Sequence, residues 1–229
     1  MIKYSLKIKD WPEEERPRER LIKWGADKLT DAELLAILLR AGYGKVTAID
    51  LARQMLHKFG GFRGLDAKSV TELCKVNGIG PAKAANIKAA LELGKRFFTA
   101  SYREMKKIDS AKDVFLLLGP YLRDLERELF KILLLTARNN LISEKTIFEG
   151  SLTEIHVNPR EIIKEALNEN AASIVLVHNH PSGIPQPSEE DRRITRQIVD
   201  ACKLVGINVL DHIIIGKNSF YSFVESGKL

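Results

Sequence analysis

Cysteine is scarce in this chain, and the scarcity limits the kinds of site that it can build. The 229 residues include two cysteines, Cys74 and Cys202, which stand far apart with no second cysteine nearby. Neither a disulfide framework nor a thiolate zinc site can be formed from them. Any metal site must therefore use histidine and carboxylate side chains. Four of the five histidines follow residue 150: His156, His178, His180 and His212.

Long hydrophobic runs are absent as well. No apolar stretch approaches the roughly 18 residues of a membrane span, and the first residues lack the apolar core of a signal peptide. We therefore expect a soluble, cytoplasmic protein. Because 45% of the residues are hydrophobic, the chain has enough apolar material for real cores, and disorder is not expected.

The net charge of +6 is small but unevenly distributed. Residues 1–100 carry 19 basic and 12 acidic side chains, whereas the remainder carries 17 basic and 18 acidic ones. A basic excess of this size is typical of a nucleic-acid-binding face, and equally of an ordinary solvated surface. The charge alone does not decide between them.

The first hundred residues predict helices separated by glycines. Thr30-Asp31-Ala32-Glu33 has the spacing of a capping box, in which the Thr hydroxyl and the Glu carboxylate satisfy free amides of the first turn. The predicted helices run from this box through Leu39, ended by Gly42; from Thr47 to Gly60-Gly61; from about Asp66 to Val76; and from Pro81 to about Arg96.

After about residue 100, helices and strands alternate. The pattern predicts a helix over 110–118 closed by Gly119-Pro120, a hairpin over 129–148, a capped helix from Asn158, a buried strand over 173–177, a long helix over 188–205 and a strand over 207–215. We therefore expect an α + α/β chain with two domains: a helical domain over residues 1–100 and an α/β sandwich over residues 101–229.

A Gly78-Ile79-Gly80 turn joins two short helices of the first region. Amides of this turn and of the helix that follows point outward at the positive end of the helix dipole, where they can hold a phosphate oxygen. Lys75, Lys83 and Lys88 add positive charge nearby. The stretch resembles the helix-hairpin-helix motif, which implies contact with the DNA backbone without sequence preference. The alternative is that the hairpin is a plain packing unit.

A second motif follows the buried strand directly. His178 and His180 stand two apart, so on an extended chain both imidazoles project from the same face and can reach one ion. With Ser188 and Asp191 the array is H-x-H-x7-S-x2-D. Two histidines and a carboxylate leave the fourth position of a tetrahedral zinc open, as a catalytic site requires. Ser188 to Asp191 is also a good helix N-terminus, and the two roles are compatible.

This array is similar to the JAMM metalloprotease motif, and its setting resembles the bacterial RadC family. The resemblance implies an N-terminal helical region with a helix-hairpin-helix, followed by a JAMM-type α/β sandwich with a mixed sheet. It covers nearly the whole chain. The segments that carry it are Asn158-Pro159-Arg160-Glu161-Ile162, Asn170-Ala171-Ala172, His178-Asn179-His180-Pro181-Ser182-Gly183 and Asp211-His212-Ile213-Ile214.

The resemblance also implies a mechanism. His178, His180 and Asp191 would hold Zn²⁺, which acidifies its water and polarises the substrate carbonyl. Glu128 would accept the proton as general base and pass it to the leaving amine. Ser188 would donate to the oxyanion.

The general base is assigned to Glu128 because it precedes the apolar strand, as the JAMM family's upstream glutamate does. Weaker candidates for this role are Glu126, Glu149 and Glu154. Asp211 and His212 could orient a ligand, although core packing or a strand-end hydrogen bond is the better supported role.

Asn179 departs from deubiquitinating JAMM members, which have a small hydroxyl residue there, so the resemblance does not imply a ubiquitin-like substrate. The first hypothesis is a zinc-dependent peptidase or isopeptidase held near DNA by the helical domain. The alternatives are a DNA repair or recombination protein acting as a nuclease, for which ligands for a second metal are missing, and a noncatalytic DNA-binding module with a structural zinc. A nucleobase deaminase is excluded because its His-x-Glu and Pro-Cys-x-x-Cys motifs are absent.

Overall fold

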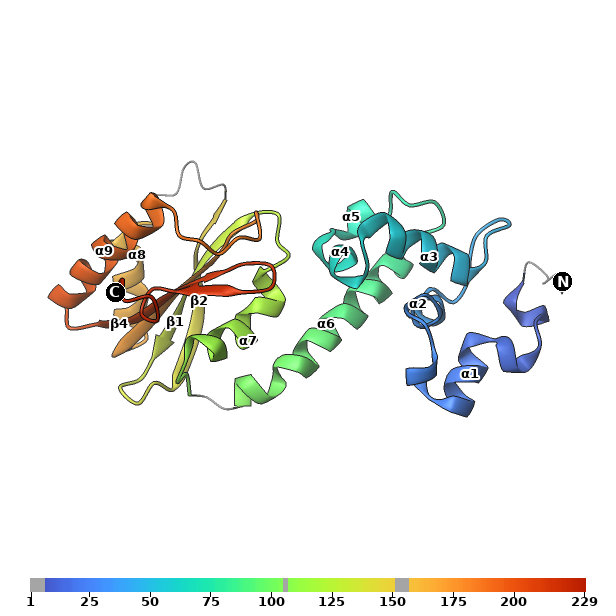
Figure 1. Cartoon of the computed structure of the whole chain (residues 1–229), viewed down its shortest axis with the longest axis horizontal. Coiled ribbons are helices and arrows are strands. Elements are labelled where there is room, and N and C mark those ends of the chain that lie inside the picture. Colours follow the sequence, from blue (N-terminus) through green and yellow to red (C-terminus); the bar gives the residue numbers. More distant parts are fainter. Residues whose placement is uncertain (1–6, 105–106, 151–156) are drawn as a thin grey trace. The chain divides into compact units, whose positions relative to one another are not determined.

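The structure is a computed structural model that describes residues 7–104, 107–150 and 157–229. It divides into two compact units, Met1–Gly94 and Lys95–Leu229, each of which has its own core (Figure 1). No helix among the described residues is long and apolar enough to cross a lipid bilayer.

The core of the helical unit lies between α2, α3 and the helices that follow them. Residues such as Leu35, Leu51 and Ile87 are fully buried in it. Side-chain caps begin α2 and α3, because the hydroxyls of Thr30 and Thr47 accept from backbone amides three residues on. In chain order the elements are η1 (Ile8–Asp10), η2 (Glu13–Glu15), α1 (Pro17–Trp24), η3 (Ala26–Lys28), α2 (Asp31–Leu39), α3 (Ala48–Phe59), α4 (Phe62–Ala67), α5 (Val70–Leu73) and α6 (Pro81–Glu104).

The helices of this unit differ from the sequence prediction at three points. Helix α2 ends at Leu39 as predicted, but the residue that terminates it is Arg40, which has a φ of 65° and is followed by a hydrogen bond from the Ala41 amide to the Leu39 carbonyl, rather than Gly42. The helix predicted over residues 66–76 is two helices, α4 and α5, because Ser69 forms a capping box that starts a new one. Helix α6 continues past Arg96 to Glu104.

The second unit contains a mixed five-stranded sheet in the order β2-β1-β3-β4-β5. Strands β3 and β4 are parallel, and the other neighbours are antiparallel. This is the mixed sheet that the JAMM resemblance implies. The elements are α7 (Ala111–Leu122), β1 (Glu128–Leu135), β2 (Leu141–Gly150), α8 (Pro159–Asn168), β3 (Ser173–Asn179), α9 (Glu189–Leu204), β4 (Asn208–Ile215) and β5 (Phe220–Ser222).

Helices cover both faces of this sheet (Figure 1). Alternate residues of β1 and β3, such as Ile132 and Leu176, pack with α8 and α9, while their neighbours Leu133 and Val177 pack with α7. The sequence predicted that Gly119-Pro120 would end α7. Pro120 instead lies inside the helix, which continues for two residues and buries Leu122.

Candidate metal centre

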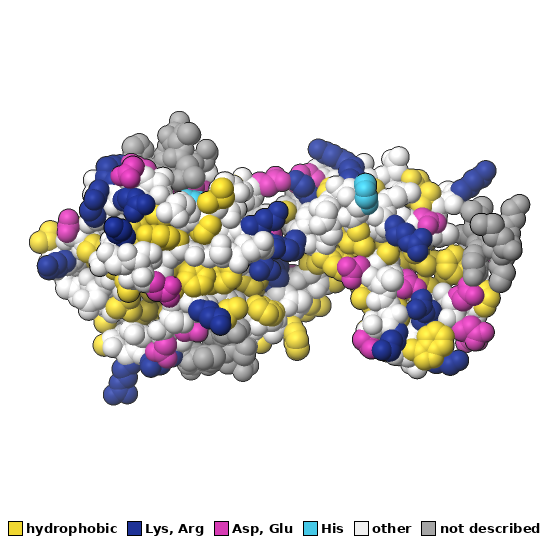
Figure 2. Space-filling view, viewed as in Figure 1, with side chains coloured by type: hydrophobic (Ala, Val, Ile, Leu, Met, Phe, Trp, Pro, Cys, Tyr) yellow, Lys and Arg dark blue, Asp and Glu magenta, His cyan; other side chains and the backbone are white. Residues whose placement is uncertain are grey.

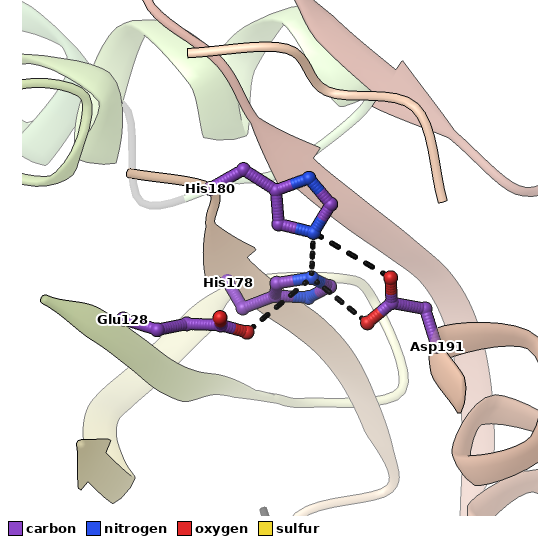
Figure 3. Close-up of side chains that lie close together, drawn as sticks. All are labelled: Glu128, His178, His180 and Asp191. Carbon is purple, nitrogen blue, oxygen red and sulfur yellow. Dashed lines mark hydrogen bonds and ion pairs between the residues drawn. The ribbon is translucent and has the colours of Figure 1, made fainter. Parts of the chain in front are cut away.

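Strand register brings the first two candidate residues together. In the antiparallel pairing of β1 with β3, Phe130 lies opposite His178. Because alternate residues share a face, Glu128 projects from the same side of the sheet as Phe130 and His178. Figure 3 shows Glu128 reaching toward the imidazole of His178 from the neighbouring strand.

Helix α9 supplies the third element. Ser188 is its N-cap, and Asp191 is the third helical residue of a capping box. Both the amide and the hydroxyl of Ser188 donate to Asp191 Oδ2, at 2.7 and 2.6 Å. The other oxygen, Oδ1, lies 3.2 Å from His178 Nε2. The cap therefore orients the carboxylate toward the histidines.

Four buried side chains meet at this point: Glu128, His178, His180 and Asp191. One potential ligand atom from each lies within 4.8 Å of the others. The two Nε2 atoms are 3.0 Å apart, and Asp191 Oδ2 is 3.5 Å from that of His180. Glu128 Oε1 is 3.7 Å from His178 Nε2. The cluster is compact enough for one metal ion.

Hydrogen bonding around the cluster fits a cation. His180 Nδ1 lies 2.8 Å from the carbonyl oxygen of Ile184 and must donate to it, which leaves the Nε2 of a neutral ring with its lone pair facing His178. Neither carboxylate oxygen of Glu128 has a hydrogen-bond partner, although the residue is 1% exposed. The Glu128 carboxylate and the His180 Nε2 lone pair are thus buried close together with no hydrogen-bond donor between them, and a metal ion would satisfy both.

The electrostatics separate the roles of the two acids. Burial raises the pKa of Glu128 to about 8, an effect that His180 opposes and Asp191 reinforces. Burial also acts to raise the pKa of Asp191, but the adjacent imidazoles of His178 and His180 and the hydroxyl of Ser188 outweigh it and hold that pKa well below its usual value. Asp191 is thus a permanent anion suited to a ligand, whereas Glu128 can exchange a proton near neutral pH.

Asn179, between the two histidines, contacts the chain on both sides of Glu128. Its Oδ1 accepts from the amide of Leu129 at 2.9 Å, and its Nδ2 donates to the carbonyl of Arg127 at 3.0 Å. These bonds hold the start of β1 against the end of β3. No pattern in the sequence predicts this structural role of Asn179.

Among the described residues, other acids that the sequence offers as the base do not belong to the cluster. Glu126 and Glu149 are exposed, and Glu149 pairs with Arg127. Glu154 lies outside the described residues. Asp211 accepts from the amides of His212 and Val224 and from the hydroxyl of Ser222, so it bonds β4 to the chain around β5 rather than joining the cluster.

His212 does approach the cluster, because its Nε2 is 2.8 Å from His178 Nδ1. A cavity of about 400 Å³ lies beside the site. It is lined by Glu126, Arg127, Glu128, Gly150, His180, Pro181 and Ser182.

The hairpin lysines of the helical unit have internal partners. Lys83 Nζ donates to the carbonyls of Ala41 at 2.6 Å and Gly78 at 2.9 Å, and Lys88 Nζ donates to the carbonyl of Asp66. Gly78 has a φ of 86°, and a Cβ there would lie 2.2 Å from the ring of Tyr43. At Gly80, by contrast, a Cβ would meet no atom within 4 Å, so the turn is open on that side.

Comparison with known proteins agrees with this architecture. Residues 108–228 match the RadC-like JAB domain, and residues 8–85 match the UPF0758 N-terminal family. A "UPF0758 protein" of Geotalea uraniireducens (strain Rf4) is 48% identical over 224 residues, covering 97% of this chain and 98% of its own. A "UPF0758 protein" of Trichlorobacter lovleyi is 49% identical and covers 97% of this chain and 98% of its own length. One of Methanosarcina mazei is 45% identical and covers 97% of each chain. The resemblance drawn from the motifs is confirmed, and the chain belongs to the UPF0758 family, with a RadC-like JAB domain as its C-terminal part.

Proposed function

We propose that this protein is a zinc-dependent metallohydrolase that cleaves a peptide or isopeptide bond. The observation that carries the proposal is the convergence of His178, His180 and Asp191 beside Glu128, a buried carboxylate with no hydrogen-bond partner and a pKa raised to about 8. A group that exchanges its proton near neutral pH suits general acid–base catalysis.

The donor set favours zinc. Two imidazoles and one carboxylate form an open catalytic set for this metal, and no cysteine belongs to the cluster. Zinc held by His178, His180 and Asp191 would supply a Lewis acid that polarises the substrate carbonyl and makes water more acidic.

The chain's own residues would handle the proton. Glu128 is adjacent to His178 and lines the cavity through which a substrate would enter, so it can take a proton from water and give it to the leaving amine. The hydroxyl proton of Ser188 goes to Asp191 Oδ2, so its first role is to orient that ligand. Donation by Ser188 to an oxyanion stays a prediction, and it would require that proton to leave Asp191.

Metal analysis followed by a substrate screen tests the proposal. Purified protein is analysed for zinc and incubated with a proteome-derived peptide library, with single-stranded and duplex DNA in parallel. We expect about one zinc per chain, and peptide cleavage that falls about 10²- to 10⁴-fold in Glu128→Gln with zinc retained. Cleavage of DNA instead would favour a nuclease, and bound zinc without hydrolysis would favour a structural metal. Either outcome contradicts the proposal.

A second proposal is that the helical unit contacts the DNA backbone through the turn around Gly80. What supports it is the open side of this turn at the start of α6, with the exposed Lys75 nearby. On the face drawn in Figure 2, basic side chains of this unit are interspersed with acidic ones, so we expect weak, salt-sensitive binding.

Because Lys83 and Lys88 have internal partners, their replacement would disturb folding as well as binding, and Lys75 is the better probe. Lys75→Glu should weaken the binding of full-length protein to fluorescent duplex DNA at low salt, and Lys112→Glu, in the other unit, serves as the matched control. Equal affinity of the two variants would assign the hairpin to packing alone.

A further inference from the structure

A chain of hydrogen bonds runs from His178 through two side chains that the proposed mechanism does not use. His178 Nδ1 lies 2.8 Å from His212 Nε2, and His212 Nδ1 lies 2.6 Å from Thr195 Oγ1. Thr195 Oγ1 in turn contacts the backbone carbonyl of Asp191, one helical turn earlier in α9. The chain thus begins at one proposed metal ligand and ends at another.

The carbonyl at one end sets the direction of every bond. A carbonyl has no proton to give, so the single hydroxyl proton of Thr195 must go to Asp191. Thr195 Oγ1 is then the acceptor for His212, whose Nδ1 carries a proton. His212 is fully buried, which favours the neutral ring, and its Nε2 is therefore a bare acceptor. His178 Nδ1 must donate to it, and the lone pair of His178 is left on Nε2.

That nitrogen is the one that faces the cluster. His178 Nε2 lies 3.0 Å from His180 Nε2 and 3.2 Å from Asp191 Oδ1. With the opposite proton order, Nε2 would carry a hydrogen and could not bind a metal. The ring of His212 is also stacked on Phe223, with centroids 4.9 Å apart and planes 11° apart, which limits its rotation.

We propose that Thr195 and His212 are positioning residues that fix His178 in the tautomer and orientation required of a metal ligand. The inference rests on the proposed metal centre but not on the hydrolysis of any substrate. Hydrogen bonds to the second ring nitrogen of a metal-binding histidine typically change metal affinity 10- to 100-fold when they are lost.

The test compares Thr195→Val, which keeps the shape and removes the hydroxyl, with Thr195→Ser, which keeps the hydroxyl. Zinc affinity is measured by competition with a chromophoric chelator, and the His178 tautomer by ¹⁵N NMR of the full-length protein with and without Zn²⁺. We expect zinc to bind about 10- to 100-fold more weakly to Thr195→Val, with loss of the His178 Nδ1–H signal. Thr195→Ser should stay within about threefold of the wild type.

A second variant guards against a folding defect in Thr195→Val. His212→Phe keeps an aromatic ring against Phe223 but removes both hydrogen bonds, and it should weaken zinc binding at least as much. Wild-type zinc affinity in folded His212→Phe, or an unchanged His178 tautomer in folded Thr195→Val, would overturn the inference. If instead every variant binds zinc as expected but no peptide is cleaved, the proposed hydrolase activity fails while the positioning roles stand.

Discussion

The buried carboxylate of Glu128 should make the metal-free protein less stable as pH rises. The pKa of this group is about 8 in the folded chain against an ordinary value of 4.5. Below pH 4.5 it is protonated in both the folded and the unfolded state. Between these values only the folded state keeps the proton, so the free energy of unfolding falls as pH rises toward 8. Glu128→Gln does not titrate and should escape this loss.

The size of the effect follows from the same two pKa values. Each pH unit in this window costs about 1.4 kcal/mol, which sets a ceiling near 5 kcal/mol by pH 8. Because Glu128 lines a cavity that water can enter, we take about half of that ceiling, roughly 2 kcal/mol. For a chain of this size, that should raise the melting temperature of Glu128→Gln above that of the wild type by about 4–8 °C at pH 8.5, with little difference at pH 4.5.

Thermal unfolding of chelator-treated protein across pH 4.5–8.5 measures this difference, with the exposed Glu126→Gln as the matched control. Zinc should shrink the gap, because a cation beside the carboxylate stabilises its ionised form. A constant offset between Glu128→Gln and the wild type at every pH would mean that Glu128 titrates as an ordinary exposed acid. The proposed base would then lie outside the buried cluster.

Three further substitutions address other contacts. His180→Ala should reduce bound zinc from about one per chain to a small fraction by metal analysis, and undiminished zinc would place the ion elsewhere. Asn179→Leu should abolish the protection of the Leu129 amide in hydrogen exchange and lower turnover with zinc retained; persistent protection would show that Asn179 does not hold β1. Lys83→Met should lower the free energy of unfolding by about 2–3 kcal/mol in denaturant titrations, because the charged amine donates to several backbone carbonyls. Unchanged stability would contradict that role.

Much of the fold could be predicted because its signals are local. The N-cap residues Thr30, Thr47 and Asn158 lie directly before the helices that they start. Strands β1 and β2 are close in the sequence, so the alternating pattern of β2 directly after β1 is enough to predict the hairpin. Local signals failed where several competed. Ser69 lies within an apolar pattern that predicts one continuous helix, yet its capping box starts a new one. Helix α7 continues through Pro120 because this buries Leu122.

The candidate site also has a part that can be predicted from local sequence and a part that cannot. His178, His180 and Asp191 lie within one strand-loop-helix segment, so their spacing alone indicates a shared ion. The contacts of Asn179 and His212 depend on how β1 and β4 align with β3, and that alignment is set by packing across residues distant in sequence. No spacing rule could reveal them.

The separation of Glu128 from the ligand segment has a consequence for timing during synthesis. A ribosome that has just added Glu128 has about fifty residues still to add before His178 is complete. The β1–β2 hairpin can form early, whereas the neighbouring position of β3 must wait for later residues. We therefore expect incomplete chains to contain Glu128 without His178, His180 and Asp191. Truncated products of translation should consequently bind no metal at this place, and the four side chains should come together only when the sheet has formed around β3.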